Sequence, residues 1–423
     1  MASLRSSALL TRLADPFAPT AGIHPESQVR MREGGRPWLL PLAASLALLA
    51  LSVVGWVTSP ERFYFAYLIG WLFCTSLALG ALFFVITHHI VKAHWGIVVR
   101  RVAEAMAMSF PALLVLSIPI WFGMHDLFHW THADLYEVGG PNYDPIIAAK
   151  ATYLNTPFFV FRVVFYFLAW WFLSHKLWKL SVGQDVQPDA DIPFKQRKAS
   201  AWGIPLFAVT VAFASYDLLM SLDPHWFSTI FGVYFFAGSF WSGVAFICLM
   251  TILLQRMGVL RGVVSTEHYH DLGKWMFAFT VFWAYIAFSQ YMLIWYANLT
   301  EETIWFSHRM EHGWQYHSAA QLGLHFILPF FVLLTRAAKR STVVLSIMAV
   351  YILIMQWFDL HWLAMPVYDY LYGGHAGFTV WDITTWLGLF GLITSLFLFR
   401  LRRHSLVPIN DPRLGRSLRF HNI

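Results

Sequence analysis

Ten apolar runs, each about 19 to 25 residues long, constrain this chain more than any other feature. A transmembrane helix needs about 20 consecutive apolar residues, whereas the helices of soluble domains carry narrower amphipathic stripes. Charged residues make up 12% of the chain, against the roughly 25% that is usual for soluble domains. We therefore expect an all-α integral membrane protein with ten transmembrane helices. The predicted spans are 39–57, 63–87, 102–122, 158–177, 201–221, 227–254, 272–297, 314–335, 341–363 and 379–401.

The positions of lysine and arginine predict how these spans are oriented. All but four of the 29 basic residues lie in the two terminal segments and in the connections that follow spans 2, 4, 6 and 8. Connections rich in Lys and Arg stay on the cytoplasmic side of a membrane. The pattern predicts a cytoplasmic N-terminal tail over 1–38, a ten-helix transmembrane domain over 39–401 and a cytoplasmic C-terminal tail over 402–423. The four exceptions are Arg62, Lys150 and Arg309 on the opposite side and Arg162 inside a span.

Charge and cysteine content exclude several classes of protein. The net charge of +6 would suggest a nucleic-acid partner in a soluble chain, but here the basic residues report membrane orientation, so we expect no nucleic acid. Cys74 and Cys248 both fall inside apolar runs, which excludes a disulfide framework and a cysteine-rich cluster within the chain. Residues 1–38 lack the apolar core of a signal peptide, so we interpret them as a tail.

Two connections on the opposite side from most basic residues carry acidic and histidine side chains. They are 123–157, which contains His125, His129 and His132, and 298–313. We expect them either to form a docking surface for a partner or to be ordinary solvated loops. A metal site at the three histidines is a further alternative, but their spacing is loose, so we expect no metal.

Ionisable residues inside the membrane are candidates for function because each costs at least ~2.5–3.5 kcal/mol at the bilayer centre. His, Asp and Glu side chains can pass protons through intervening water, so two half-membrane sets suggest a proton path. Hydrogen bonding between helices is the alternative interpretation. The outer set is Arg162, Asp217, His317, Gln321, His325, Asp359 and Asp382, and the inner set is His88, His89, His94, Glu104 and His175.

The spacing within the outer set predicts some of its geometry. His317, Gln321 and His325 are four residues apart and should share one helix face. Asp217 and Asp359 each occur between an aromatic residue and leucine, near the predicted outer ends of spans 5 and 9, with His361 just beyond Asp359. This short repeat suggests a duplicated arrangement. Deep histidines are too few to favour an intrinsic bis-histidine haem.

Two segments are more specific than the topology. The first runs from Asp217 to Tyr234 with the sequence DLLMSLDPHWFSTIFGVY, and the second is FSQYMLIWYAN over 288–298, followed by EET. They resemble the NrfD/polysulfide-reductase family of membrane subunits, and within it the F-type subunits of bacterial alternative complex III. The resemblance covers most of the chain from about 39 to 400.

The resemblance implies two four-helix bundles, spans 2–5 and 6–9, flanked by spans 1 and 10, in a bacterial cytoplasmic (inner) membrane. It implies a subunit of a quinol:electron-acceptor oxidoreductase that serves an electron-transport chain. Haem c and iron–sulfur clusters would lie on partner subunits: a multihaem cytochrome c, an iron–sulfur protein and a homologous NrfD-like subunit. This chain would contact lipids, hold no redox metal or other tightly bound cofactor, and act in structure and in proton conduction.

Two alternatives remain open at the sequence level. In the first, the chain binds quinol or quinone itself in an outer-side pocket, and His317 or Asp217 accepts the proton. In the second, which belongs to a different class, the chain is a stand-alone secondary transporter whose prolines break helices near mid-membrane. The acidic loops and the two matched segments favour assembly into a complex.

Overall fold

The structure is a computed structural model that describes residues 29–31, 35–374 and 376–422. The described part of the chain is all-helical, without strands, and contains the predicted number of ten helices long and apolar enough to cross a membrane. Single helices form seven of these spans and the eighth predicted span is interrupted only by a change of helix type. The spans are α3 (Leu39–Thr58), α4 (Pro60–Ile90), α5 to α7 (Ile97–Phe122), α10 (Thr156–Val186), α11 (Ile192–Leu218, extended by η3 to Leu222), α12 (Phe231–Arg256), α13 (Thr266–Ala297), α15 to α16 (Trp314–Leu334), α18 (Thr342–Tyr372) and α19 (Val380–Leu401).

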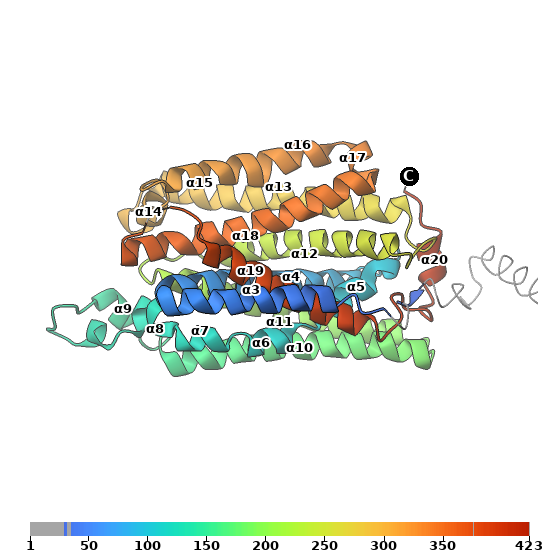
Figure 1. Cartoon of the computed structure of the whole chain (residues 1–423), viewed down its shortest axis with the longest axis horizontal. Helices are drawn as coiled ribbons and strands as arrows, with labels where there is room; N and C mark the ends of the chain where they lie inside the picture. Colours follow the sequence, from blue (N-terminus) through green and yellow to red (C-terminus); the bar gives the residue numbers. More distant parts are fainter. Residues whose placement is uncertain (1–28, 32–34, 375, 423) are drawn as a thin grey trace, which may run out of the picture.

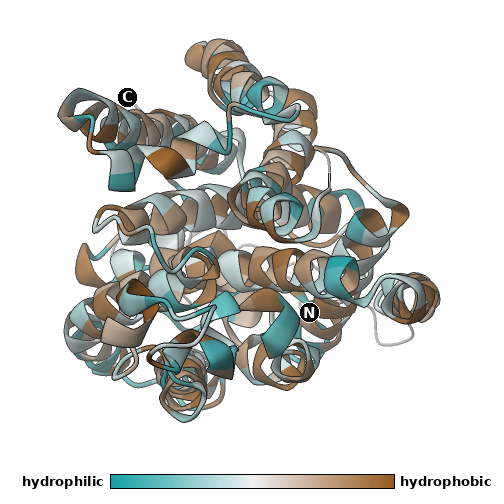
Figure 2. Ribbon diagram, turned by 90° about the vertical axis from the view of Figure 1, so that its left-hand side faces the viewer, coloured by the Kyte–Doolittle hydropathy of each residue, from teal (hydrophilic) through white to brown (hydrophobic). Residues whose placement is uncertain are grey.

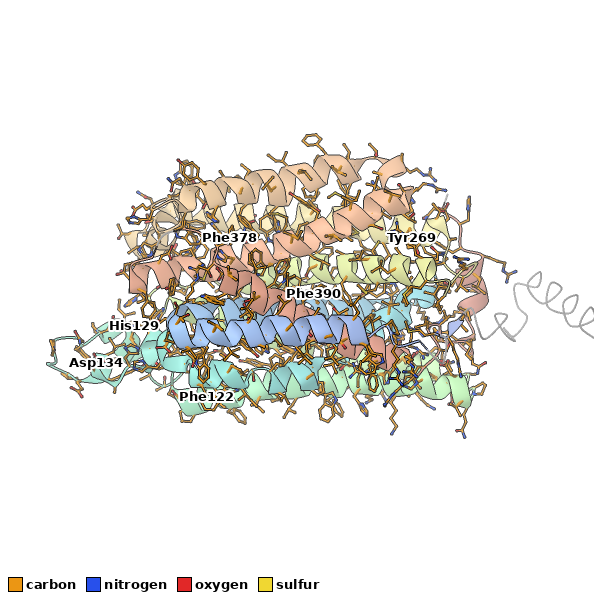
Figure 3. The ribbon with its side chains drawn as sticks, viewed as in Figure 1. Phe122, His129, Asp134, Tyr269, Phe378 and Phe390 are labelled. Atoms are coloured by element: carbon orange, nitrogen blue, oxygen red, sulfur yellow. The ribbon has the colours of Figure 1, made fainter. Side chains whose placement is uncertain are left out.

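The spans lie side by side along the longest axis of the molecule (Figure 1). One end carries α17 (Arg336–Arg340) and α20 (Leu414–Leu418), and we call it the basic end. The other, the far end, carries α8 (Met124–Leu127), α9 (Pro145–Ala149) and α14 (Thr300–Ser307). Figure 2, which looks onto the far end, shows apolar colour along the helices and polar colour in the connecting segments. Figure 3 places His129 and Asp134 at the far end and Tyr269 toward the basic end.

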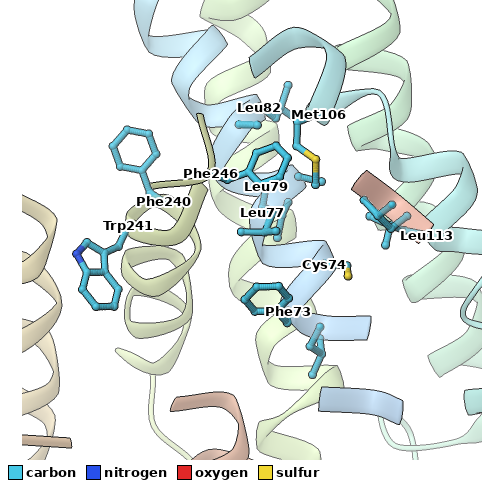
Figure 4. Packing of buried hydrophobic residues seen from close by; sticks show 14 of the residues in the cluster. Phe73, Cys74, Leu77, Leu79, Leu82, Met106, Leu113, Phe240, Trp241 and Phe246 are labelled. Atoms are coloured by element: carbon cyan, nitrogen blue, oxygen red, sulfur yellow. The ribbon is translucent and has the colours of Figure 1, made fainter. Parts of the chain in front are cut away.

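Helices α4 and α12 form the centre of the fold. They pack along each other, α4 also packs against α5, α11 and α19, and α12 packs against α13 and α18. Figure 4 shows the apolar packing between them, which includes Phe73 and Leu77 from α4 and Phe246 from α12. The two helices approach most closely at glycines, because a Cβ on Gly80 would lie 2.1 Å from the Ser239 carbonyl oxygen. Small residues at such crossings allow the close backbone packing on which membrane helices depend.

The third span is interrupted where proline occurs. It consists of α5 (Ile97–Ala107), α6 (Phe110–Val115) and α7 (Ile118–Phe122), and a proline occupies the first turn of both α6 and α7. Proline lacks a backbone N–H and is tolerated at the first turn but not in a helix interior. The eighth span is continuous, but its middle third, η4 (Gln321–Ile327), is a π-helix between α15 (Trp314–Ala320) and α16 (Leu328–Leu334).

Several helices are longer than predicted, and one of these differences corrects the predicted depth of a site residue. Helix α10 extends to Val186 instead of 177, and α18 extends to Tyr372 instead of 363. Asp359 therefore does not lie near the end of its helix, as the sequence suggested, and His361, which the predicted span also contains, lies inside α18. The hydropathy pattern ended early because the last turns of α18 contain tyrosine and aspartate, which continue the helix without being apolar.

The C-terminal segment 402–423 is not a loose tail in its described part. It folds back across the basic end, where α20 contacts α5 (Figure 1). Gln184 and Asn410 donate side-chain hydrogen bonds to each other's backbone carbonyl oxygens at 3.1 and 3.2 Å. Most of the predicted N-terminal tail, residues 1–28 and 32–34, lies outside the described residues.

Candidate functional site

The first intramembrane carboxylate, Asp217, forms an ion pair with an arginine. The Arg162 guanidinium donates Nε and Nη2 to the two carboxylate oxygens of Asp217, each at 2.9 Å. The Tyr166 hydroxyl donates to the same carboxylate at 2.8 Å. Such a two-pronged pair is the strongest geometry for arginine and a carboxylate. Asp217 is completely buried, so this pair joins α10 to α11 inside the protein.

The surroundings of Arg162 strengthen this interpretation. Its Nη1 donates to the Tyr153 carbonyl oxygen at 2.8 Å, and its guanidinium carbon lies 3.8 Å from the centre of the Tyr153 ring. Because all three guanidinium nitrogens of Arg162 donate hydrogen bonds, the charged groups of Arg162 and Asp217 find their partners within the protein. Removing one partner of a buried pair typically costs 3–5 kcal/mol, whereas an intact pair contributes much less net stability.

The second intramembrane carboxylate, Asp359, has a different environment. The Tyr234 hydroxyl and the Gln321 amide both donate to its Oδ1, the amide at 2.9 Å. Asp359 is 2% exposed, and within the described part of the chain no Lys, Arg or His forms an ion pair with it. A buried carboxyl group without a cation is less costly when it carries a proton. The two buried carboxyl groups therefore differ in that an arginine accompanies Asp217 and only neutral donors accompany Asp359.

The π-helix places the predicted stripe of α15 and η4 toward the interior. Gln321 and His325 are buried and His317 is partly buried, so the three share the inward-facing side as predicted. His325 packs on the rings of Trp241 and Trp283, with ring centroids 4.3 and 3.6 Å apart. Neither of its ring nitrogens has a hydrogen-bond partner among the described residues. Single π-helical turns inside α-helices occur frequently at functional sites.

Two histidines, His317 and His361, lie on the far-end side of Asp359. The rings of His317 and His361 are nearly parallel with centroids 6.2 Å apart, and Phe378 packs against both (Figure 3 labels Phe378). His361 is completely buried, and neither ring nitrogen has a hydrogen-bond partner among the described residues. The structure thus brings His317 of α15, Gln321 of η4 and the α18 residues Asp359 and His361 together. We call these four residues and Tyr234 the Asp359 cluster.

Asp382, like Asp217, is paired with an arginine. Its carboxylate accepts from Arg62 Nη2 at 2.6 Å and from the Thr379 backbone N–H at 2.6 Å. Together with the Thr379 side chain this forms a capping box at the start of α19. The arrangement satisfies the first backbone donors of the helix, which is a structural role.

The predicted inner set is divided by the structure. Glu104 accepts from Arg100 at 3.0 Å and lies 3.2 Å from Arg101, so it is cation-matched like Asp217. His88 Nδ1 lies 2.7 Å from the Phe84 carbonyl oxygen, and the ring stacks on Phe84. His89 is buried without a hydrogen-bond partner among the described residues. His175 instead lies on the exposed face of α10, so it does not join the others.

The C-terminal segment covers this inner set from the basic end. Asp411 accepts from Arg100 and from Arg413, each at 3.0 Å. Burial alone would raise the pKa of Asp411, but the two guanidinium groups hold it below its usual range. His94 lies 3.2 Å from Arg416, and burial together with Arg416 and Arg413 lowers the pKa of this imidazole.

The far-end loops are tied to one another. His225 Nε2 lies 2.6 Å from an Asp144 carboxylate oxygen, and Lys150 donates to the Pro224 carbonyl oxygen at 2.5 Å. His132 stacks on His125 with ring centroids 3.9 Å apart, and His129 lies beside it. The residues that the structure describes contain no group of three or more His, Cys, Asp or Glu side chains placed to hold a metal ion.

Two residues of the site were not singled out from the sequence. Tyr234 lies within the segment 217–234 but was not predicted as a site residue. It lies seven residues before Trp241, just as Tyr64 lies seven residues before Trp71. This internal repeat could have indicated it. Arg309 was counted as a loop residue, but it is buried and donates to the Leu363 carbonyl oxygen at 2.7 Å beside Pro366. Burial lowers the pKa of Arg309 to about 9, so it remains charged at neutral pH.

A cavity of about 440 Å³ opens between α13 and the far-end half of the eighth span. Its walls are mostly aromatic and aliphatic, and the lining residues that carry a hydroxyl or amide group are Tyr234, Gln290, Tyr291, Ser318 and Gln321. Tyr234 and Gln321 connect it directly to Asp359. The two bases predicted for quinol, His317 and Asp217, do not line this cavity.

Comparison with known proteins adds no family assignment, since no protein-family model and no curated protein matches the chain.

Proposed function

We propose that this chain is an integral membrane subunit of a quinol-oxidising electron-transport complex and that it conducts protons through the Asp359 cluster. Redox metals would belong to partner subunits, and this chain would contribute structure and proton transfer. The proposal of a complex rests on the two matched segments, 217–234 and 288–298, which resemble subunits of alternative complex III. The proposal of proton transfer rests on the geometry of the carboxylates.

One observation carries the proton-conducting role. Asp359 is buried in a membrane-spanning helix and receives hydrogen bonds from neutral donors, whereas Asp217, Asp382 and Glu104 each contact arginine. A protein that needed Asp359 only to join helices would gain more from a cation partner, as at the other three sites. An intramembrane carboxyl group without one is characteristic of proton relays.

The histidines extend this site toward both ends. His317 and His361 lie toward the far end, His325 lies one turn deeper than Gln321, and His88 and His89 lie at the basic end beneath the C-terminal segment. A neutral imidazole carries one N–H donor and one acceptor nitrogen, so these groups suit relays in two half-paths that meet inside the protein. Water between them would complete the path.

The overall arrangement that we propose follows the sequence-based prediction. Helices α4, α5 to α7, α10 and α11 would form one four-helix bundle, and α12, α13, α15 to α16 and α18 the other, with α3 and α19 flanking them. The helix contacts support this division, because each group closes on itself and α4 meets α12 between them. The basic end would face the bacterial cytoplasm, in accordance with its Lys and Arg content.

The test is the ratio of protons translocated to electrons transferred in the purified complex, reconstituted in liposomes. We expect Asp359→Asn to lower this ratio strongly while quinol oxidation continues. Asp134→Asn, which removes an exposed carboxylate from the far-end loop, is the matched control and should leave the ratio unchanged. An unchanged ratio in Asp359→Asn would refute proton conduction by this cluster. Failure of the tagged chain to copurify with cytochrome c and iron–sulfur partners would refute the complex.

The cavity beside α13 favours a second candidate function, quinol binding by this chain. Its volume of about 440 Å³ falls within the usual range for small-molecule sites, and its apolar walls with few polar groups suit a hydroxylated lipophilic ring. Quinol bound there would donate its proton through Gln321 or Tyr234 to Asp359, rather than to His317 or Asp217.

Filling the cavity tests this second candidate. Ala287→Trp would place a large ring inside it, and Ala278→Trp would place the same ring on the exposed face of the same helix. Quinol binding at this site predicts a higher KM for quinol in Ala287→Trp alone. Equal KM values in the two variants would place the quinol site elsewhere.

A further inference from the structure

A second cavity, of about 750 Å³, lies between α10 and α11 at the basic end, far from the Asp359 cluster. Four lysines line it, two from each helix, together with the aromatic ring of Trp202. They are Lys176, Lys179, Lys195 and Lys198. No other described cavity of the molecule gathers cations in this way.

The charge of this cavity is largely uncompensated by the protein. Asp189 is the acid that lines it, and it pairs with Lys195 at 2.8 Å. Asp185 lies nearby but contacts Arg101 inside the protein, and Asp191 is exposed on the connection. The other three lysines form no ion pair within the described part of the chain. The cavity therefore presents about three free positive charges to a ligand.

The lysines lie at the depth of lipid headgroups. Helix α10 has 31 residues and is about 46 Å long, which exceeds the roughly 30 Å of a bilayer's hydrocarbon core. Lys176 follows the start of α10 by about 30 Å, so it and Lys179 lie where the hydrocarbon ends. Lysine at this level can extend its ammonium group toward phosphate.

The surface below the lysines suits acyl chains. Phe172 on α10 is 56% exposed and Trp202 on α11 is 37% exposed, and Lys176 lies 5.2 Å from the centre of the Trp202 ring. Gly183 leaves the wall of the cavity open, since a Cβ there would meet nothing within 4 Å. Free phosphate has no apolar part and would therefore not contact this adjoining apolar surface.

We propose that this cavity binds the headgroup of an anionic phospholipid, and that two phosphates fit it best. The phosphate oxygens accept hydrogen bonds from the lysine ammonium groups, and the acyl chains follow the exposed aromatic residues along α10 and α11. Basic pockets between transmembrane helices on the cytoplasmic side are suited to diphosphate headgroups. This proposal is independent of proton conduction because none of its residues belongs to the Asp359 cluster.

Native mass spectrometry of the delipidated full chain in detergent tests the proposal. The probes are cardiolipin, phosphatidylglycerol, phosphatidylethanolamine and inorganic phosphate. The test variant K176Q/K179Q/K195Q/K198Q removes four positive charges from the cavity, and K92Q/R256Q/R261Q/R336Q removes four exposed charges elsewhere. Each lysine near an anionic headgroup contributes about fivefold to binding, so three unpaired lysines predict about 100-fold weaker cardiolipin binding by the test variant.

The expected result is preferential binding of cardiolipin over phosphatidylethanolamine, retained by the control variant and lost by the test variant. Equal weakening in the two variants would refute a specific site. Binding of inorganic phosphate that excludes cardiolipin would assign the cavity to free phosphate and overturn the lipid proposal. If the test variant does not fold, Gly183→Trp, which fills the cavity without changing charge, should abolish the preference, and retention of the preference would contradict the proposal.

Discussion

Asp217 and Asp359 follow an aromatic residue and precede leucine in two helices four spans apart, yet the structure gives them opposite environments. Arg162 and Tyr166 enclose Asp217 with three hydrogen bonds. Tyr234 and Gln321 provide hydrogen bonds to Asp359, but no cation pairs with it among the described residues. One carboxyl group is paired with arginine and the other is not, and we propose that the unpaired one gains and loses a proton.

We propose that Asp217 has a structural role and Asp359 a chemical one. The seventh residue of α10 is Arg162. The corresponding far-end part of the eighth span instead contributes Gln321, which lies in a π-helix. Replacement of a cation by an amide keeps the hydrogen bond but removes the charge. The cavity next to Gln321 further distinguishes the second site, because Asp217 has none of the described cavities beside it.

The largest expected effect is on stability. Asp217→Ala would leave Arg162 buried without its partner, so the free energy of unfolding should fall by about 3–5 kcal/mol. Asp359→Asn keeps the size and a hydrogen-bonding group, so its loss should stay below about 1 kcal/mol. Thermal unfolding in detergent measures both. Equal losses would mean that the two sites do not differ in the way described.

Conversion of the second site into the first is the next test. Gln321→Arg would bring a guanidinium group to Asp359, with room available in the adjoining cavity. Proton transfer by a positioned side chain typically contributes 10²–10⁴-fold, so we expect proton translocation to fall by about 100-fold or more. The fold should persist, as judged by thermal unfolding. Normal translocation in a folded Gln321→Arg protein would contradict the comparison.

Asp411 is a further carboxylate paired with arginine, and its ion pairs should make the stability of the C-terminal segment depend on pH. Because Arg100 and Arg413 outweigh burial and lower the pKa of Asp411, the folded protein holds this carboxylate charged below its ordinary pKa of 3.8. Its contribution is fully present above that value and is lost as pH falls through the lowered pKa. We expect the C-terminal segment to detach in acid, with about 2 kcal/mol at stake.

Hydrogen exchange across residues 402–422 measures this detachment as a function of pH. Asp411→Asn should expose the segment to exchange already at neutral pH, and its protection relative to the intrinsic exchange rate at each pH should no longer change across the acid range. Protection of the segment in Asp411→Asn equal to that of the unmodified protein would show that the ion pairs do not hold it in place.

A matched pair of tyrosine variants compares the two sites through one hydrogen bond each. Tyr166→Phe and Tyr234→Phe each remove one hydrogen bond to a carboxylate, which is worth roughly 1.5–3 kcal/mol when the acceptor is charged and about 1 kcal/mol when it is neutral. We expect Tyr166→Phe to lower stability without altering proton translocation. Tyr234→Phe should lower stability less and slow translocation by several fold. The reverse assignment of these effects would contradict the account.

Much of the fold follows from the sequence because it depends on local properties. The length of an apolar run predicts a span, and the spacing of His317, Gln321 and His325 predicts a common face, which the structure confirms. Prolines also indicate where the third span is broken. The far-end extension of α18 was missed because helix continues past the apolar part of the span.

The chemistry of the site depends on contacts between distant residues, which periodicity does not report. Both Arg162 and Asp217 were identified as intramembrane residues, but their pairing across 55 positions emerges only when α10 packs on α11. Neither the π-helix at Gln321 nor the folding of the C-terminal segment onto Arg100 leaves a pattern in composition. The distinction between Asp217 and Asp359 therefore required the structure.

Infrared difference spectroscopy on the purified complex tests the central claim most directly, because protonated carboxyl groups have a carbonyl stretch that carboxylates lack. We predict that quinol oxidation produces a difference band in this region, that Asp359→Asn abolishes it, and that Asp382→Asn leaves it in place. Persistence of the same band in Asp359→Asn would show that Asp359 does not exchange a proton during turnover and would contradict the account.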